Sequence, residues 1–239
     1  MNRILFEHGE IDPDGMVSLQ DFRAEHLRQV LRVEPGKLVK TGEVGGLVGF
    51  SEVLSVSPEQ VVLSTNHCDT AVPPWVDLLL AVPRPKVLKR LWPQLAALGV
   101  RRIFLINAFK VEKFYFSSQW IQPEFYRPLL VEGLMQCGAT ALPEVAVCQR
   151  FRPFMEDAFP RLFEGQPTRL VAHPGVTQTP SVTGGGIPVV AIGPEGGWTD
   201  YELDCFARAG FAKWSLGKRI LRTDTAAIAL LSVLDYARS

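Results

Sequence analysis

The stretch from Val189 to Thr223 constrains the fold more than any other part of the chain. It opens with Val189–Ile192, an apolar run with β-branched residues that is long enough for a buried strand. The glycine-rich segment G-P-E-G-G follows at 193–197, and Thr199 then precedes Glu202 by three residues, the spacing of a capping box at a helix N-terminus. The sequence therefore predicts a strand, a glycine loop and a helix in immediate succession.

A second unit of the same kind follows at once. Gly210 suits the end of the first helix, and Phe211–Leu216 is apolar enough for another strand. The basic turn G-K-R-I-L-R comes next, and Thr223 is expected to cap a final helix that runs to about Ala237. Two such turns at neighbouring strand ends predict a crevice of the kind in which open α/β sheets bind ligands.

The glycine loop has the properties of a binding loop, although its spacing alone does not prove one. Glycines let a ligand approach the backbone closely, and a helix N-terminus presents unpaired N–H groups and a positive dipole end. However, G-P-E-G-G matches neither the dinucleotide fingerprint nor the phosphate-binding P-loop, and many strand–glycine–helix turns bind nothing.

Strand and helix patterns alternate beyond Pro73-Pro74, which favours a mostly parallel sheet. Pro93 and Pro128 lie inside helical patterns and are expected to kink or restart those helices. The predicted strands are Val76–Val82, Ile103–Ala108, Val145–Val147 and Leu170–His173, and the predicted helices are Lys86–Leu98, Pro123–Cys137 and Arg152–Phe163.

The first 72 residues have a different pattern and are expected to form a separate domain, with 73–239 as the second. Short strand patterns separated by turn residues indicate a small β-barrel. The predicted strands are Lys37–Thr41, Gly46–Glu52 and Val61–Ser64, preceded by a helical stretch at His26–Val33. Arg28 and Arg32 lie on the polar face of that stretch, which is either a solvated face or a contact with nucleic acid.

Composition narrows the function classes. The 25 basic and 25 acidic residues cancel, but the first 72 residues hold 6 basic and 11 acidic ones, so any charge-driven RNA contact is expected mainly in the remainder. No apolar run is long enough for a membrane span, and the N-terminus lacks a signal-peptide core. The four cysteines show no C-x-x-C pair, which argues against a zinc site and favours a reduced, cytoplasmic protein without a metal.

Two motif pairs resemble a known family. G-P-E-G-G-W-T-D-Y-E-L followed by L-G-K-R-I-L-R-T-D-T-A-A resembles the C-terminal signature of the 16S ribosomal RNA uridine-N3 methyltransferases called RsmE, in the SPOUT superfamily. H-L-R-Q-V-L-R-V followed by P-G-K resembles the start of their N-terminal domain. The resemblance implies a trefoil-knotted, mostly parallel α/β domain preceded by a PUA-like β-barrel that contacts RNA, a homodimer, and the small ribosomal subunit as partner.

The resemblance also implies a cofactor, S-adenosylmethionine, bent in the knot and held mostly by loop backbone. The cofactor-binding residues are then His173, Ile192, Gly193, Pro194, Glu195, Gly196, Gly197, Leu216, Gly217, Ile220, Leu221 and Thr223. For His173 a solvated loop position is the alternative.

The same resemblance puts basic residues beside the cofactor. Arg222 and Arg219 are candidates for stabilising a uracil anion or gripping an RNA phosphate, unless they only pair with Asp200 or Asp224. Glu195 is a candidate base, or else a structural carboxylate that accepts loop N–H groups, and no dedicated general base stands out. With Arg28 and Arg32, Arg219 completes the set of expected RNA contacts.

The match to the family is uneven. Where it usually has E-Q-S-G-R, this chain reads M-Q-C-G-A from Met135 to Ala139, and the R-S segment after the second strand reads N-A-F-K at 107–110. The cofactor half matches well and the substrate-facing half poorly. Two alternatives therefore stay open: a methyltransferase for another RNA base, and an RNA-binding or ribosome-assembly factor with weakened catalysis.

Overall fold

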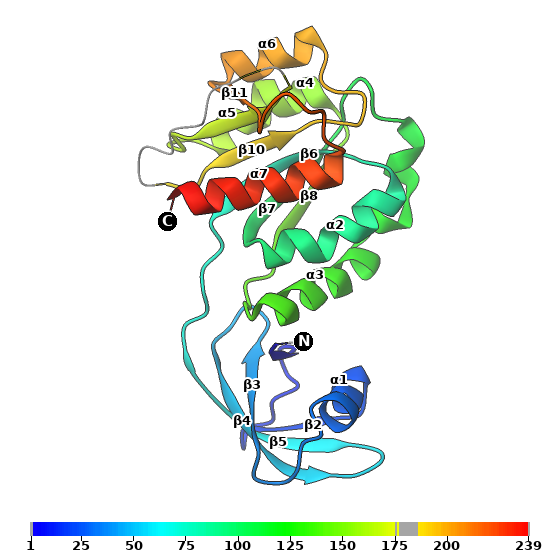
Figure 1. Ribbon diagram of the computed structural model, residues 1–239, viewed down its shortest axis with the longest axis vertical. Helices are drawn as coiled ribbons and strands as arrows, with labels where there is room; N and C mark the ends of the chain where they lie inside the picture. The colour runs from blue at the N-terminus through cyan, green and yellow to red at the C-terminus, as the bar shows by residue number, and fades with distance from the viewer. Residues whose placement is uncertain (1, 175, 177–185, 239) are drawn as a thin grey trace. The chain divides into compact units, whose positions relative to one another are not determined.

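The structure is a computed structural model that describes residues 2–174, 176 and 186–238. The chain divides into two compact units, which Figure 1 shows coloured along the sequence. The first comprises Met1–Pro73 with Val131–Leu142, and the second comprises Pro74–Leu130 with Pro143–Ser239. In the described part of the chain, no helix is long and apolar enough to cross a membrane.

The first unit is built on a curled sheet in which the described strands follow the order β1-β3-β4-β5-β2. The strand β1 runs parallel to β3, and the other pairs are antiparallel. The strands are β1 (Ile4–Phe6), β2 (Met16–Leu19), β3 (Leu38–Glu43), β4 (Val48–Val56) and β5 (Val61–Asp69). The sequence patterns located β3, β4 and β5 but missed β1 and β2, which are too short to show an alternation of their own.

The helical part of this unit begins earlier than predicted. Asp21 accepts a hydrogen bond from the Arg23 N–H and so starts α1 (Phe22–Glu25), which continues as a π-helical turn over His26–Val30. The prediction of a helix over His26–Val33 was therefore wrong at both ends. Ala24 and Leu27 are fully buried against sheet residues, which explains why the apolar spacing there was informative.

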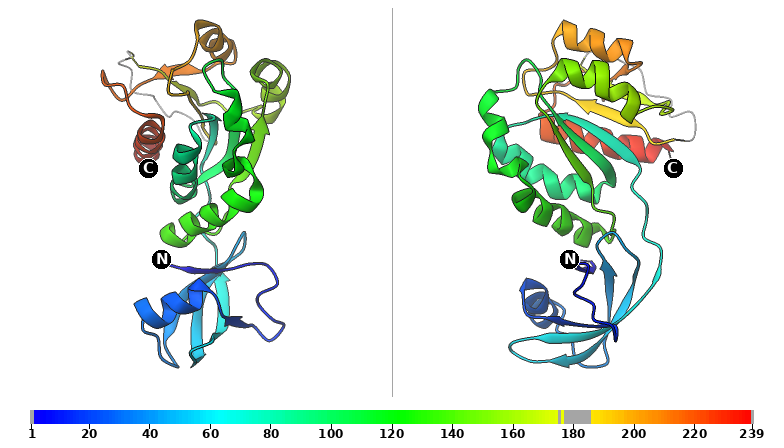
Figure 2. Two further views of the ribbon diagram at one scale, coloured as in Figure 1. Left: turned by 90° about the vertical axis from the view of Figure 1, so that its right-hand side faces the viewer. Right: turned by 180° about the vertical axis from the view of Figure 1, so that it is seen from behind.

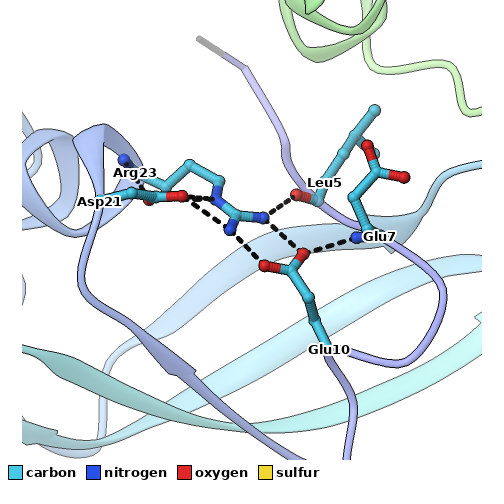
Figure 3. A network of polar contacts seen from close by, with 5 residues as sticks. All are labelled: Leu5, Glu7, Glu10, Asp21 and Arg23. Atoms are coloured by element: carbon cyan, nitrogen blue, oxygen red, sulfur yellow. Dashed lines mark hydrogen bonds and ion pairs between the residues drawn. The ribbon is translucent and has the colours of Figure 1, made fainter.

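A network of charged groups around Arg23 ties the helix to the amino-terminal strand (Figure 3). The guanidinium of Arg23 pairs with Asp21 and Glu10 and donates to the Leu5 carbonyl oxygen over 2.8 Å. Glu10 also accepts from the Glu7 N–H over 2.6 Å. Burial by itself would lower the pKa of Arg23, but its carboxylate partners raise that pKa above the ordinary value. This cation is therefore a fixed part of the first unit.

The carboxyl-terminal half of α3 (Pro123–Cys137) belongs to the first unit. The Met135 carbonyl oxygen accepts hydrogen bonds from the N–H groups of Asn2 and Arg3, at 2.9 and 3.1 Å. The guanidinium of Arg3 donates to Gly138 and Thr41 carbonyl oxygens. The segment that departs from the family motif thus joins the amino-terminal strand to the rest of this unit.

The second unit is built on a parallel sheet in which the described strands follow the order β11-β9-β10-β6-β7-β8. The strand β10 (Val189–Ile192) lies between β9 and β6 and is buried throughout, as its apolar run predicted. The other strands are β6 (Val76–Ala81), β7 (Val100–Ile106), β8 (Glu144–Cys148), β9 (Arg169–Ala172) and β11 (Ala212–Trp214).

Helices cover both faces of this sheet, with α2 (Pro85–Ala97) and α7 (Thr223–Arg238) on one face (Figures 1 and 2). On the other face lie α4 (Phe151–Pro153), α5 (Phe159–Leu162) and α6 (Asp200–Arg208), with a π-helical turn over Phe154–Ala158 joining the first two. Stacked and tilted phenylalanine rings fill that second layer: Phe104 of β7 lies 5.2 Å from Phe163 between ring centroids. Short 3-10 turns at Lys113–Ser117 and Gln119–Ile121 lead into α3.

Neither proline restarts its helix, which was one of the two predicted effects, a kink or a restart. The helix α2 runs through Pro93, and α3 runs through Pro128, without a break in either assignment. In α2 the neighbours Leu91, Trp92 and Leu95 are almost fully buried. Their burial offsets the hydrogen bond that a proline removes from the helix interior.

A buried carboxylate closes the amino edge of the sheet. Asp77 of β6 is fully buried and is bonded by Arg101 and Arg102, each with a shortest distance of 2.6 Å, and by Gln166. These groups all lie at the edge opposite the glycine loop.

Candidate functional site

The glycine loop follows β10 as a tight turn. The Gly197 N–H donates to the Pro194 carbonyl oxygen over 2.8 Å, and Gly197 has a φ of +71°, a conformation that residues with a side chain rarely adopt. The indole of Trp198 packs beneath the loop, with ring atoms 3.0 Å from the place where a Cβ on Gly193 would lie. The loop is therefore a compact, fixed platform.

The predicted capping box is confirmed and has a second task. The Thr199 hydroxyl accepts from the Glu202 N–H, and the Glu202 carboxylate accepts from the Thr199 N–H over 2.7 Å. The other oxygen of this buried carboxylate accepts from the Phe109 N–H over 2.7 Å. Glu202 thus joins the helix cap to the loop that follows β7, 93 residues away in the chain.

Gly196 makes room for a side chain of the protein itself. The Lys110 ammonium donates to the Gly196 carbonyl oxygen over 2.7 Å, and a Cβ on Gly196 would lie 2.9 Å from Lys110 Cδ. That separation is shorter than any normal carbon–carbon contact. The sequence predicted that this glycine lets a ligand approach the backbone. In the structure, a side chain at position 196 would point toward Lys110.

Glu195 links the glycine loop to the loop after β6. Its Oε1 accepts a hydrogen bond from the Arg84 N–H over 3.1 Å, and Arg84 is the residue just before α2. A carboxylate at the start of α2 also interacts favourably with the positive end of the helix dipole. The sequence left two roles open for Glu195, a base or a structural carboxylate. This hydrogen bond is the contact expected of a structural carboxylate.

Three loops at the carboxyl ends of β9, β10 and β11 surround a pocket of about 510 Å³ together with the start of α7. Thirteen of the residues expected at the site line it: His173, Ile192, Gly193, Pro194, Glu195, Gly196, Gly197, Leu216, Arg219, Ile220, Leu221, Arg222 and Thr223. Gly217, also expected there, does not line the pocket. The two tryptophans that line the pocket lie beside the motifs, so the sequence could have indicated them. The lining residues that the sequence did not predict are Ala172, Pro174, Trp198, Trp214, Ser215, Ala226 and Leu230.

His173 is half-buried at the wall of the pocket. Its N–H donates to the Trp214 carbonyl oxygen over 2.9 Å, which holds β9 against β11. Its ring Nδ1 and the Trp198 Nε1 are buried, and neither has a hydrogen-bond partner among the described residues. A buried polar atom without a partner costs about 1–3 kcal/mol, so both atoms favour a polar ligand nearby.

The two arginines at the rim remain largely solvent-exposed. The Arg222 side chain is 73% exposed, and its Nε lies 3.7 Å from Oδ1 of Asp224. The other oxygen of Asp224 makes a shorter ion pair, 2.8 Å long, with Arg90. Arg219 makes no ion pair within the part of the chain that the structure describes. Both guanidinium groups are therefore available to a bound molecule.

Thr223 does not cap the final helix as predicted, because α7 begins at Thr223 itself. Its hydroxyl donates to the Gly193 carbonyl oxygen over 3.4 Å, which links the helix to the glycine loop. The main-chain N–H of Ala226 donates to the Arg222 carbonyl oxygen over 2.7 Å. The start of α7 is thus held directly at the pocket.

The remaining predicted residues lie in the first unit. The Arg28 guanidinium approaches the Ser57 carbonyl oxygen at 3.4 Å, and Arg32 is exposed. Arg32 has a φ of +46°, and no other described non-glycine residue has a positive φ. Such a conformation costs about 1–2 kcal/mol for a residue with a side chain.

A comparison with known protein families shows the family of this chain. The family model described as RNA methyltransferase domain matches residues 71–235, more than half of the chain. The chain belongs to the RNA methyltransferase family. Ribosomal RNA small subunit methyltransferase E of Treponema pallidum (strain Nichols) is 30% identical over 242 residues, covering 98% of this chain and 90% of that protein. Ribosomal RNA small subunit methyltransferase E 1 of Borreliella burgdorferi is 25% identical, covering 96% and 95%.

Solved structures share the fold of this RNA methyltransferase family member over nearly its whole length. A ribosomal RNA small subunit methyltransferase E from Neisseria gonorrhoeae, bound to S-adenosyl methionine, has a TM-score of 0.78 at 22% identity and covers 99% of this chain and 97% of its own. A Legionella pneumophila protein described as a methyltransferase with bound cofactor SAM has a TM-score of 0.71 at 24% identity, with coverages of 99% and 97%.

The departures from the family motif differ in their relation to the pocket lining: Lys110 of the 107–110 segment bonds to Gly196, which lines the pocket. Met135 is buried and Ala139 half-buried in the first unit, and neither lines the pocket. Within the described residues, no group of three or more histidine, cysteine or acidic side chains can hold a metal ion.

Proposed function

We propose that this protein transfers a methyl group from S-adenosylmethionine to N3 of a uridine in 16S ribosomal RNA of the small ribosomal subunit. The observation that carries the proposal is the pocket built by the loops after β9, β10 and β11, in a chain that belongs to the RNA methyltransferase family. The names of the relatives support the small-subunit substrate.

The residues present fit S-adenosylmethionine. A pocket of about 510 Å³ is in the range for a cofactor of this size. Loop N–H groups and the unpartnered ring atoms of His173 and Trp198 suit its polar groups, and Leu216, Ile220 and Leu221 offer apolar surface to its adenine. When bound, the cofactor supplies an electrophilic methyl group on a positively charged sulfur.

The arginines at the rim would carry the chemistry on the RNA side. As uridine N3 loses its proton, negative charge grows on the uracil ring, and this charge falls again as N3 accepts the methyl group. Arg222 and Arg219 stabilise that charge, and the forked guanidinium also suits an RNA phosphate. Glu195 holds the loop in place through the Arg84 N–H as a structural carboxylate, and the N3 proton passes to solvent water.

We further propose the finer features of the family for this chain: a trefoil knot around the pocket, a PUA-like first unit that contacts RNA through Arg28 and Arg32, and action in the cytoplasm. We also propose a homodimer. A groove of about 360 Å³ between α2 and α7 includes Leu91 and Ile228, and Tyr236 of α7 is 86% exposed. Leu91 is almost fully buried, so the exposed side chains of Ile228 and Tyr236 on α7 are what supports burial against a second copy. Light scattering that finds only 26.5 kDa at all concentrations would refute the homodimer.

Calorimetry and a methyl-transfer assay test the main proposal. S-adenosylmethionine should bind with a dissociation constant of about 1 μM, equivalent to about −8 kcal/mol. Radiolabelled methyl groups should pass to small ribosomal subunits that lack the modification. Absence of binding heat at high ligand concentration, or of label transfer, would overturn the proposal.

A further inference from the structure

The loops beside the pocket form a continuous edge at the carboxyl ends of the strands. Because the sheet order is β10-β6-β7-β8, the glycine loop is followed along this edge by the loops after β6, β7 and β8. These loops carry Arg84, then Phe109 with Lys110, then Arg150. Hydrogen bonds join the loops after β6 and β7 to the glycine loop, from Arg84 N–H to Glu195 and from Lys110 to the Gly196 carbonyl oxygen. Another joins the loops after β7 and β8, from Asn107 to the Gln149 carbonyl oxygen.

Phe109 is the unusual member of this edge. Its side chain is 83% exposed, while its N–H is bonded to the buried Glu202 carboxylate and the next residue is bonded to Gly196. The main chain is therefore held at Phe109 itself, and the side chain of the next residue is bonded to the glycine loop, beside an aromatic residue that contacts solvent. Because the main chain there is already held, stacking of a flat group costs the conformational entropy of the Phe109 side chain alone.

The charges around Phe109 favour a polyanion. Arg84, Lys110 and Arg150 are exposed and make no ion pair within the part of the chain that the structure describes. The Glu202 carboxylate is buried and accepts the Phe109 N–H, whereas Glu195 is exposed although it accepts the Arg84 N–H. Glu112 is the exposed acidic residue of the loop after β7. Cations interleaved with an aromatic ring are the pattern of single-stranded nucleic acid binding.

The chemistry of the proposed substrate requires an unpaired strand here. Uridine N3 lies on the edge of the base that pairs in a duplex, so the target must be unpaired, and its neighbours must leave the pocket over an adjacent surface. Resting on the proposed function, we propose that the edge formed by Arg84, Phe109, Lys110 and Arg150 binds the single-stranded RNA that flanks the target uridine, with one base stacked on Phe109.

Binding of unmodified small ribosomal subunits by Phe109 variants tests this inference. Phe109→Ala should raise the dissociation constant for subunits about tenfold, the effect of losing one base–aromatic stack, and Phe109→Trp should restore it to within about threefold. The dissociation constant for S-adenosylmethionine and the melting temperature should stay at wild-type values in both variants, since Phe109 is highly exposed and does not line the pocket.

A matched control and a charge test sharpen the result. Leu162 is an apolar side chain 43% exposed at the opposite edge of the sheet, where Arg102 contacts its carbonyl oxygen, so Leu162→Ala should leave subunit binding unchanged. Replacing Arg84 and Arg150 together by Ala should make the plot of log affinity against log salt shallower by about 1.4, or about 0.7 for each phosphate that the protein no longer neutralises.

The possible outcomes separate the two proposals. Subunit affinity that is unchanged in Phe109→Ala, while the wild-type protein methylates subunits, would overturn the inference and leave the proposed function standing. Loss of self-association with unchanged subunit affinity would show that Phe109 serves a protein contact, which also overturns it. A wild-type protein that binds neither S-adenosylmethionine nor subunits would refute the proposed function itself.

Discussion

The ammonium of Lys110 lies 2.7 Å from the carbonyl oxygen of Gly196, and its aliphatic stem fills the space where a side chain on that glycine would lie. This contact joins the loop after β7 to the glycine loop at the pocket. It explains the glycine at position 196 by packing within the protein.

Gly196→Ala should therefore destabilise the protein by about 1 kcal/mol and weaken binding of S-adenosylmethionine about tenfold, because the loop must shift to avoid Lys110. Lys110→Ala removes Cδ and should relieve much of this penalty. A double-mutant cycle of thermal unfolding and calorimetry measures the coupling between the two positions. If the effects of the two substitutions are strictly additive, the new side chain at position 196 does not clash with Lys110.

Glu195→Gln should lower turnover less than tenfold. The amide oxygen still accepts the Arg84 N–H, and the lost charge at the start of α2 costs about 0.5 kcal/mol. Glu195→Ala, which also loses the acceptor, should reduce the melting temperature more. If Gln alone lowers single-turnover rates by a hundredfold at unchanged cofactor affinity, the carboxylate acts as a base.

The sequence was sufficient to predict the central strand and the glycine loop of the second unit, but not the contacts that shape its pocket. The apolar run Val189–Ile192 and the Thr199–Glu202 spacing are local signals, and both were confirmed. The links from Phe109 to Glu202 and from Lys110 to Gly196 span 93 and 86 residues, so no local pattern shows them.

Two further kinds of error have physical causes. The strand β1 at Ile4–Phe6 has only three residues, and it forms because β3 offers a parallel partner far along the chain. A restart of the helix at Pro93 was one of the predicted effects, but α2 is continuous there, because the tertiary burial of Trp92 beside it overrides the local preference.

Arg222→Ala should reduce turnover on small ribosomal subunits by about two to three orders of magnitude and leave cofactor affinity nearly unchanged, if the guanidinium stabilises developing charge. Arg90→Ala is the matched control, because Arg90 makes the shorter ion pair with the same Asp224. Single-turnover kinetics with saturating subunits compare the two.

Three other results would assign Arg222 differently. Loss of subunit affinity with a shallower salt dependence would indicate a phosphate contact. Equal loss of stability in the Arg222 and Arg90 variants, with turnover intact, would indicate a structural cation. Unaltered turnover, binding and stability would remove Arg222 from the active residues.

The stability of the second unit should depend on acid through Asp77. Burial by itself raises the pKa of this carboxyl, but hydrogen bonds from Arg101, Arg102 and Gln166 outweigh it and hold the pKa below its ordinary value. Because the folded pKa is the lower one, the stabilisation is complete above about pH 4–5 and is lost as pH falls through the folded pKa.

Asp77→Asn should therefore cost about 3 kcal/mol of unfolding free energy at pH 7, and the gap to wild type should narrow at pH 3. Asp157→Asn, which changes an exposed carboxylate, is the control and should cost little at either pH. Urea unfolding at the two pH values measures both variants. A gap that stays constant between them would contradict the assigned role of Asp77.

Mass spectrometry of nucleosides tests the central claim most directly. Small ribosomal subunits lacking the modification are incubated with the wild-type protein and S-adenosylmethionine, and their 16S ribosomal RNA is then digested. We predict the appearance of 3-methyluridine, at one position per subunit, and its strong reduction with Arg222→Ala. A methyl group on another base, or no methylated nucleoside from a protein that binds the cofactor, would contradict this claim.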